Sequence, residues 1–173
     1  EPLRHPGCRR EAGGATEPAA QRVRKGPARP RGETAMSHPN LPPALAAGQR
    51  TVEKRAGRLS FYVAGEGPPM LLVHSINAAG SAYEIKPVFE HCVSGHRVFA
   101  PDLPGFGFSN RSRRRYDVGL YVAAIRDMLD TVAEDCGPGP VDALALSLSS
   151  EFLARVAAES PAAEGRPLPA PPP

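Results

Sequence analysis

The sequence predicts an α/β fold in which a mostly parallel sheet carries helices on both faces and is preceded by an N-terminal β-hairpin. Two observations support this prediction. Short apolar runs, typical of strands buried on both faces, alternate with longer segments whose apolar residues recur every three or four positions. Two short alternating runs around a glycine come before them and are typical of a hairpin. Because strands that alternate with helices pair in parallel through right-handed crossovers, the middle of the chain is predicted to form such a sheet.

The predicted strands and helices follow one another in a regular order. The hairpin occupies 50–64 and turns at Ala56-Gly57. The strands that follow it are expected at 70–73, 96–100 and 141–146, and the helices that alternate with them at 81–91, 117–135 and 151–158.

Local signals indicate where these helices begin and end. Ser81 is a candidate N-cap, and Glu84, three residues later, suggests a capping box. Pro87 lies inside the same helix and predicts a kink or a break there. Asp117 is expected to cap the longest helix, and Gly137 is expected to end it.

Proline-rich segments flank the predicted domain. Residues 48–160 are the part able to build a core. The segments 1–47 and 161–173 combine Pro, Gly, Ala and Arg without a hydrophobic period, and we expect them to be disordered. Met36 begins a more ordinary stretch and is interpreted as a possible true start of the protein. The alternative interpretation of the first segment is a basic arm that touches acidic surfaces.

Charge and composition exclude several classes of function. The 173 residues include 21 Lys and Arg against 18 Asp and Glu, and the basic excess lies in residues 1–35, so the predicted domain has no basic groove for nucleic acid. No apolar run approaches the roughly 20 residues of a membrane span. The three cysteines have no repeated spacing and predict neither a disulfide framework nor a zinc site. We therefore expect a cytoplasmic protein without a metal, a cofactor, or a nucleic-acid or membrane partner.

A serine lies at the junction between the last predicted strand and the helix that follows it. The segment Ala145-Leu146-Ser147-Leu148-Ser149 has small residues two positions before and two positions after Ser147. This pattern is typical of a nucleophile elbow, a turn so sharp that it raises the serine above the sheet. The helix N-terminus supplies N–H groups able to stabilise an oxyanion. The alternative interpretation is a serine that only caps the helix.

Two further segments, taken with this pentapeptide, resemble the first half of an α/β-hydrolase. Leu71-Leu72-Val73-His74-Ser75 resembles the strand and His-Gly turn of that family, with Ser75 in place of the usual Gly. Residues 98–109 resemble its Asp-x-x-Gly-x-Gly-x-Ser loop, whose glycines let the backbone turn beside the active-site mouth. Asn110 stands where a nucleotide-binding G-x-G-x-x-G loop needs its third glycine, which argues against that alternative.

The resemblance implies a site and a chemistry. Ser147 would be the nucleophile toward an ester or a related small-molecule acyl substrate, with no cofactor. The backbone N–H groups of Leu148 and Ile76 would hold the oxyanion, and His74 would be a supporting residue of its turn rather than the base. A serine at the elbow argues against dehalogenase or epoxide-hydrolase chemistry and is compatible with esterases, carbon–carbon bond hydrolases and cofactor-free haloperoxidases. The segments after His74 and Ser147 suggest a bacterial subgroup.

The rest of the expected triad is missing from this sequence. In the family that it resembles, the catalytic acid and histidine follow the nucleophile along the chain. No Asp and no His follows Ser147, and Glu151, Glu159 and Glu164 are the only later acids. We therefore expect a truncated, inactive chain whose elbow strand lies at an open sheet edge, through which an oligomer or aggregate would form. The alternative function is a non-catalytic fragment that binds a partner through the same edge.

Overall fold

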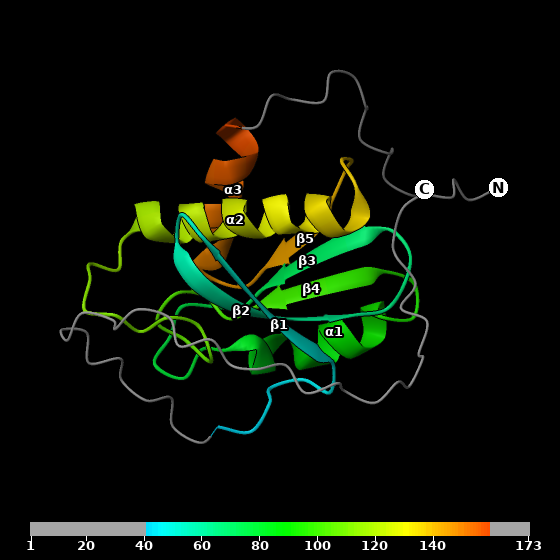
Figure 1. The fold of residues 1–173 in the computed structure, drawn as a ribbon, viewed down its shortest axis with the longest axis horizontal. Coiled ribbons are helices and arrows are strands. Elements are labelled where there is room, and N and C mark those ends of the chain that lie inside the picture. Colours follow the sequence, from blue (N-terminus) through cyan, green and yellow to red (C-terminus); the bar gives the residue numbers. More distant parts are fainter. Residues whose placement is uncertain (1–40, 160–173) are drawn as a thin grey trace, which may run out of the picture.

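The computed structural model of the protein describes residues 41–159, which form a single sheet covered by helices (Figure 1). Met36, the first part of the predicted N-terminal extension and the whole predicted tail at 161–173 lie outside the described residues. Ala44 to Ala47 contact the sheet: Leu45 is buried, and the Ala44 N–H donates to the Tyr62 hydroxyl at 2.9 Å.

The sheet has five strands in the order β1-β2-β4-β3-β5. The β1–β2 and β2–β4 pairs are antiparallel, and the β3–β4 and β3–β5 pairs are parallel. The predicted α/β class and the hairpin are therefore confirmed, but the sheet is mixed rather than mostly parallel, because the second hairpin strand also pairs with β4. The strands are β1 Gly48–Lys54, β2 Gly57–Ala64, β3 Pro69–Val73, β4 Arg97–Pro101 and β5 Asp142–Ala145.

Helices cover both faces of this sheet, as predicted (Figure 1). α2, Val118–Cys136, and α3, Ser149–Glu159, pack against each other on one face. The short 3-10 helix η1, Ala82–Ile85, and α1, Lys86–Cys92, lie on the other. Within residues 41–159, no helix is both long enough and apolar enough to cross a membrane.

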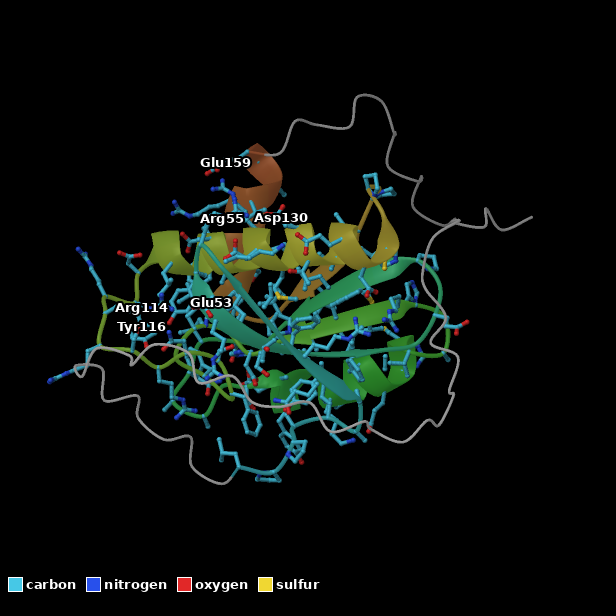
Figure 2. All side chains as sticks on the ribbon, viewed as in Figure 1. Glu53, Arg55, Arg114, Tyr116, Asp130 and Glu159 are labelled. Carbon is cyan, nitrogen blue, oxygen red and sulfur yellow. The ribbon has the colours of Figure 1, made fainter. Side chains whose placement is uncertain are left out.

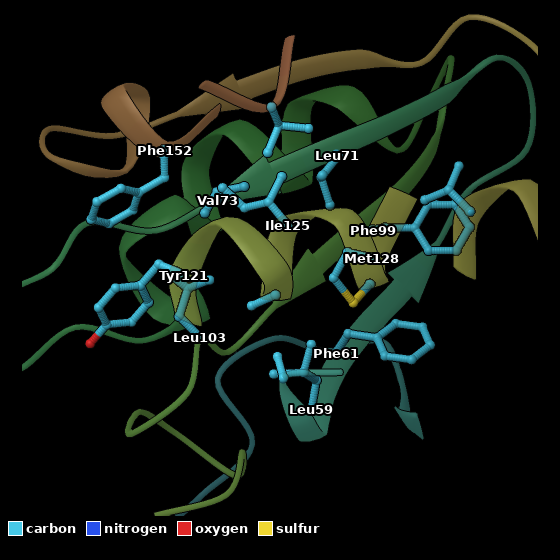
Figure 3. Packing of buried hydrophobic residues seen from close by; sticks show 14 of the residues in the cluster. Leu59, Phe61, Leu71, Val73, Phe99, Leu103, Tyr121, Ile125, Met128 and Phe152 are labelled. Atoms are coloured by element: carbon cyan, nitrogen blue, oxygen red, sulfur yellow. The ribbon is translucent and has the colours of Figure 1, made fainter. Parts of the chain in front are cut away.

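Alternation along the strands divides the core into two layers. Leu71 and Val73 of β3 belong to the layer beneath α2 and α3, and Leu72 belongs to the layer above α1. Ile125 and Met128 of α2 fill the first layer, as Figure 3 shows. Burying one such side chain stabilises the fold by about 1.5–3 kcal/mol, so the apolar face of α2 is a main reason why this helix lies on the sheet.

The helix signals were only partly correct. The predicted helix at 81–91 is divided into η1 and α1, which confirms the break expected at Pro87; this proline lies in the first turn of α1, where its missing N–H leaves no hydrogen bond unmade. Ser81 caps η1 by accepting from the Tyr83 N–H at 3.2 Å. The capping box was wrong, because the Glu84 carboxylate binds Ser75 instead. Asp117 caps α2 as predicted.

Ion pairs attach the hairpin to α2. Arg55, which follows β1, places its Nε 2.7 Å from a carboxylate oxygen of the fully buried Asp127 and also contacts Asp130. Figure 2 shows Arg55 and Asp130 beside each other along α2. The other Asp127 oxygen accepts from the Ala56 N–H at 2.7 Å. Because Asp127 is buried and both of its oxygens are bonded, its loss would leave buried polar groups unpaired.

Candidate active site

Ser147 lies in the turn between β5 and α3, at the carboxyl end of the sheet. Its φ of +52° is the one positive value among the non-glycine residues from 41 to 159. A serine in this left-handed region is strained, and such strain gathers at functional sites. The Ser147 side chain is exposed, and so is Leu148, at 46%. The geometry is that of the sharp turn that the small-x-Ser-x-small pattern predicts.

The helix that follows begins immediately after this turn. The N–H groups of Ser149, Ser150 and Glu151 donate to the carbonyls three residues earlier at 3.0–3.1 Å. The N–H of Leu148 donates to no group within residues 41–159. An unpaired N–H at the first turn of a helix is well suited to bind an anion.

His74 lies directly after β3 and is completely buried. The Leu103 N–H donates to its Nε2 at 2.9 Å, so the proton of the neutral ring is on Nδ1, which donates to the Ser75 carbonyl at 2.7 Å. Burial holds the pKa of His74 below its ordinary value, because it penalises the charged ring. With both nitrogens engaged and no contact to Ser147, His74 is placed to shape the turn and not to remove a proton from the serine.

Ile76 follows in the same turn, and its half-buried side chain packs against the α2 layer of the core. Its backbone N–H, like that of Leu148, donates to no group in the described part of the chain. The Leu146 N–H donates to the Val73 carbonyl at 3.0 Å, so the two turns leave the sheet at neighbouring positions. The structure therefore brings Ile76 and Ser147 to the same end of adjacent strands.

A buried serine joins the two turns directly. Ser149, the small residue two positions after Ser147, donates its hydroxyl to the His74 carbonyl at 2.6 Å. The sequence analysis assigned Ser149 only a steric role, since a small residue is needed there. A hydroxyl two residues after Ser147, where only a small residue is needed, is the sequence signal for this hydrogen bond.

The glycine-rich loop after β4 contains buried groups whose roles the sequence analysis missed. The carboxylate of Asp102 accepts from the N–H groups of Ala82 and Phe108 at 2.9 and 3.0 Å. Gly107 has a φ of +46°, and a Cβ there would lie 2.0 Å from the Asp102 carboxyl carbon. The loop glycine is therefore required by a close approach as well as by its turn, and the motif spacing of Asp102 and Gly107 is the signal that could have shown it.

A second missed group is the carboxylate of Glu84, in η1. It accepts from the backbone N–H of Ser75 at 2.9 Å, from the Ser75 hydroxyl at 2.7 Å and from the Asn77 side-chain amide at 2.5 Å. Ser75 stands where the resembled family has glycine, and that departure is the sequence signal for this cluster. The cluster ties η1 to the turn that carries Ile76.

The other histidines of the described chain are far from Ser147 along the strands. His96 precedes β4, and its Nε2 lies 3.8 Å from a carboxylate oxygen of Asp142, the first residue of β5. Ser147 lies beyond the opposite end of β5, and the three residue steps from Asp142 to Ala145 alone span about 10 Å at roughly 3.3 Å per residue. His91 is exposed on α1. Neither residue hydrogen-bonds Ser147, so the part from 41 to 159 supplies no histidine base.

The described residues contain no metal centre, and a hollow among them lies over the hairpin. Among them, no group of three or more His, Cys, Asp or Glu side chains is arranged to hold a metal ion. A hollow of about 370 Å³ lies over the hairpin rather than at the two turns. The residues that line it are Gln49, Arg50, Thr51, Arg58, Ser60 and Phe108.

Comparison with known proteins identifies the class to which this fold and these turns belong. The family model of the α/β hydrolase fold matches residues 68–163, more than half of the chain. This chain belongs to that family.

Particular relatives share only part of their length with it. E-2-(acetamidomethylene)succinate hydrolase is 25% identical with a TM-score of 0.56, over 65% of this chain and 40% of that one. A putative epoxide hydrolase from Pseudomonas aeruginosa is 24% identical with a TM-score of 0.54, over 65% and 37%. An uncharacterized protein from Mycobacterium tuberculosis is 35% identical over 75 residues, which are 43% of this chain. The chain spans 21% of the length of that curated relative.

Proposed function

We propose that this chain is the nucleophile-bearing part of a serine hydrolase that acts on an ester or a related acyl substrate. The observation that carries the proposal is the left-handed backbone of Ser147, at +52°, in a non-glycine residue whose side chain is exposed between β5 and α3. A serine that only capped the helix would need extended backbone, as Asp117 has at the start of α2. Strain without a stabilising contact of the Ser147 side chain favours a functional role.

The proposed reaction proceeds in two steps. The Ser147 oxygen attacks the acyl carbon, its proton passes to a base, and the negative charge that develops on the acyl oxygen is held by the N–H groups of Leu148 and Ile76. The alcohol leaves with a proton, and an acyl-Ser147 intermediate remains. Water then attacks this ester, releases the carboxylic acid and returns the proton to the serine.

The base is not supplied by this sequence. No His follows Ser147, and the nitrogens of the buried His74 are both occupied. We therefore propose that in a longer relative an Asp and a His outside the matched region complete the triad, and that this chain alone does not turn over substrate. The carboxylate nucleophile of epoxide hydrolases is replaced here by a serine, which is why an acyl substrate is proposed.

A fluorophosphonate probe tests the nucleophile without requiring turnover. We expect slow labelling of the full chain at Ser147, identified by peptide mass spectrometry, and no ester hydrolysis. Labelling should disappear in Ser147→Ala and persist in the control Ser94→Ala, which removes an exposed hydroxyl after α1 that has no contact with the elbow. Labelling spread over several serines, or none in a chain that melts cooperatively, would contradict the proposal.

The position of β5 favours a second candidate function, in which the sheet edge binds a partner. Within residues 41–159, β5 pairs with β3 alone, and Asp142 and Ala143 are exposed. An exposed strand edge offers unpaired backbone groups to another strand. If the partner is a second copy, sedimentation should show a dimer whose fraction rises with concentration. A monomer at every concentration would exclude self-association.

A further inference from the structure

The Glu84 carboxylate receives more hydrogen bonds than its place on the surface of η1 requires. Four contacts reach its two oxygens, from the N–H and hydroxyl of Ser75 and from the side-chain amide of Asn77, at 2.5–2.9 Å. The Asn77 amide also contacts the Ser75 hydroxyl at 2.6 Å. The cluster therefore holds the first residues of the turn after β3 from outside the sheet.

The carboxylate is charged at neutral pH. Burial acts against ionisation of Glu84, but the hydrogen bonds from Ser75 and Asn77 outweigh it and bring the pKa below its ordinary value. Hydrogen bonds to a charged acceptor are stronger than neutral ones. The cluster can therefore hold the backbone in one orientation.

The orientation matters because of the peptide that follows. The Ser75 N–H is bound by Glu84, and the carbonyls of Ser75 and His74 accept from the His74 ring and from Ser149. The His74 ring holds the Ser75–Ile76 peptide through its carbonyl, while Glu84 holds the preceding peptide through the Ser75 N–H and also fixes the Ser75 side chain. The Ile76 N–H, in the plane of the Ser75–Ile76 peptide, is left without an acceptor in the described chain.

We propose that Glu84 is a positioning residue that holds the Ile76 N–H in the orientation needed to bind an oxyanion. This inference rests on the proposed function, since it takes Ile76 and Leu148 as the two oxyanion donors. It adds that one donor is oriented by a charged side chain from another element, whereas the other is oriented by the start of α3. Glu84 touches no reacting atom and acts through Ser75.

Binding of phenylphosphonate, a tetrahedral anion, tests this role without any chemistry. In ¹⁵N-labelled full chain, we expect the amide signals of Ile76 and Leu148 to shift together as phenylphosphonate is added. In Glu84→Gln, the Ile76 shift at saturation should be reduced or lost, and the anion concentration at the midpoint, which both amides report, should rise at least tenfold. Glu90→Gln is the matched control, because it makes the same change at an exposed residue of α1. It should titrate like the unmodified chain.

If Glu84 had a purely structural role, its replacement would change the melting temperature and not the anion titration. If Glu84→Gln lowers the melting temperature but leaves the Ile76 titration unchanged, the inference is wrong. If Glu84→Gln does not fold, Glu84→Asp decides, since it keeps the negative charge but shortens the side chain and draws both oxygens away from Ser75. A weakened Ile76 response in Glu84→Asp supports the inference, and an unchanged one overturns it.

The same titration separates this inference from the proposed function. If neither amide responds in the unmodified chain, both the oxyanion assignment and the role of Glu84 fail. If both amides respond with the expected dependence on Glu84 but the fluorophosphonate does not label Ser147, the nucleophile assignment fails and the role of Glu84 stands. Phenylphosphonate binding in Ser147→Ala should match the unmodified chain, because the serine oxygen is not needed to hold the anion.

Discussion

The turns after β3 and after β5 present one backbone N–H each at the same end of the sheet, but they are held in opposite ways. The turn after β3 is buried at His74 and Ser75 and is held by side chains, with His74, Ser75 and Glu84 all hydrogen-bonded. The turn after β5 is exposed at Ser147 and Leu148 and is held mainly by backbone, through a left-handed Ser147 and the first hydrogen bonds of α3, with the hydroxyls of Ser149 and Ser150 added. The comparison indicates that the strained, accessible Ser147 is tolerated because the neighbouring turn after β3 is rigidly held.

The largest effect is expected in the loop after β4, where the backbone of Gly107 lies close to Asp102. Gly107→Ala would place a methyl group against the buried Asp102 carboxylate at a φ of +46°, so we expect a loss of about 3 kcal/mol or more in the free energy of unfolding. Urea denaturation measures it. Gly119→Ala, in the first turn of α2 with room for a Cβ, is the control and should stabilise by about 0.5–1 kcal/mol. Equal effects at the two glycines would contradict the close approach.

The next effect concerns the bond between the two turns. Ser149→Ala removes the hydroxyl that binds the His74 carbonyl and leaves that carbonyl buried without this partner. We expect a loss of about 1–2 kcal/mol in the free energy of unfolding. Ser150→Ala, at an exposed neighbouring position, should change it by less than about 0.5 kcal/mol. If both variants unfold alike, the turns are not coupled through Ser149.

A smaller effect of the opposite sign is expected at Ser147 itself. Ser147→Gly removes the Cβ that makes a left-handed backbone costly, so it should stabilise the fold by up to about 1 kcal/mol. Ser150→Gly, inside α3, should instead destabilise by about 0.5–1 kcal/mol because glycine is unfavourable in a helix. Thermal melts of the two variants should therefore move in opposite directions. Movement in the same direction would show that the elbow stores no strain.

The smallest effect depends on pH and comes from the buried turn. The pKa of His74 is lower in the folded protein than in the unfolded chain, where it is about 6.5. The unfolded chain therefore binds more protons just below pH 6.5, and stability falls as pH decreases from that value toward the folded pKa. His74→Gln should flatten this slope, whereas His91→Gln, at an exposed position on α1, should not. Urea midpoints between pH 7.5 and 5.5 measure both slopes.

The sequence predicted those features that depend on residues close together in the chain. The spacing of Tyr121, Ile125 and Met128 predicted α2 because one helix face must be apolar, and the small residues around Ser147 predicted the elbow because a sharp turn excludes larger ones. The sequence did not predict the pairing of strands that are distant in the chain. The antiparallel pairing of β2 with β4 depends on how the hairpin folds over the sheet, and no pattern within either strand encodes it.

The side-chain network of the site was missed for a related reason. Glu84 follows Ser81 by three residues, and this spacing favoured a local cap. The carboxylate binds Ser75 instead, because the turn after β3 presents a backbone N–H and a hydroxyl together. The two donors of Ser75, in the turn after β3, bind the Glu84 carboxylate in place of the nearby donor of Ser81. This pairing is visible only once the turn has folded.

The strand order has a consequence for where a substrate can approach. The chain leaves β3 toward the α1 face to reach β4, and then crosses on the α2 face to reach β5 on the opposite side of β3. The segments that follow β3 and β5 therefore depart toward opposite faces, and the direction of winding reverses between them. In open α/β sheets such a reversal leaves a crevice outside the carboxyl ends of the two strands. Ser147 and Ile76 lie beside the point where this reversal would leave such a crevice.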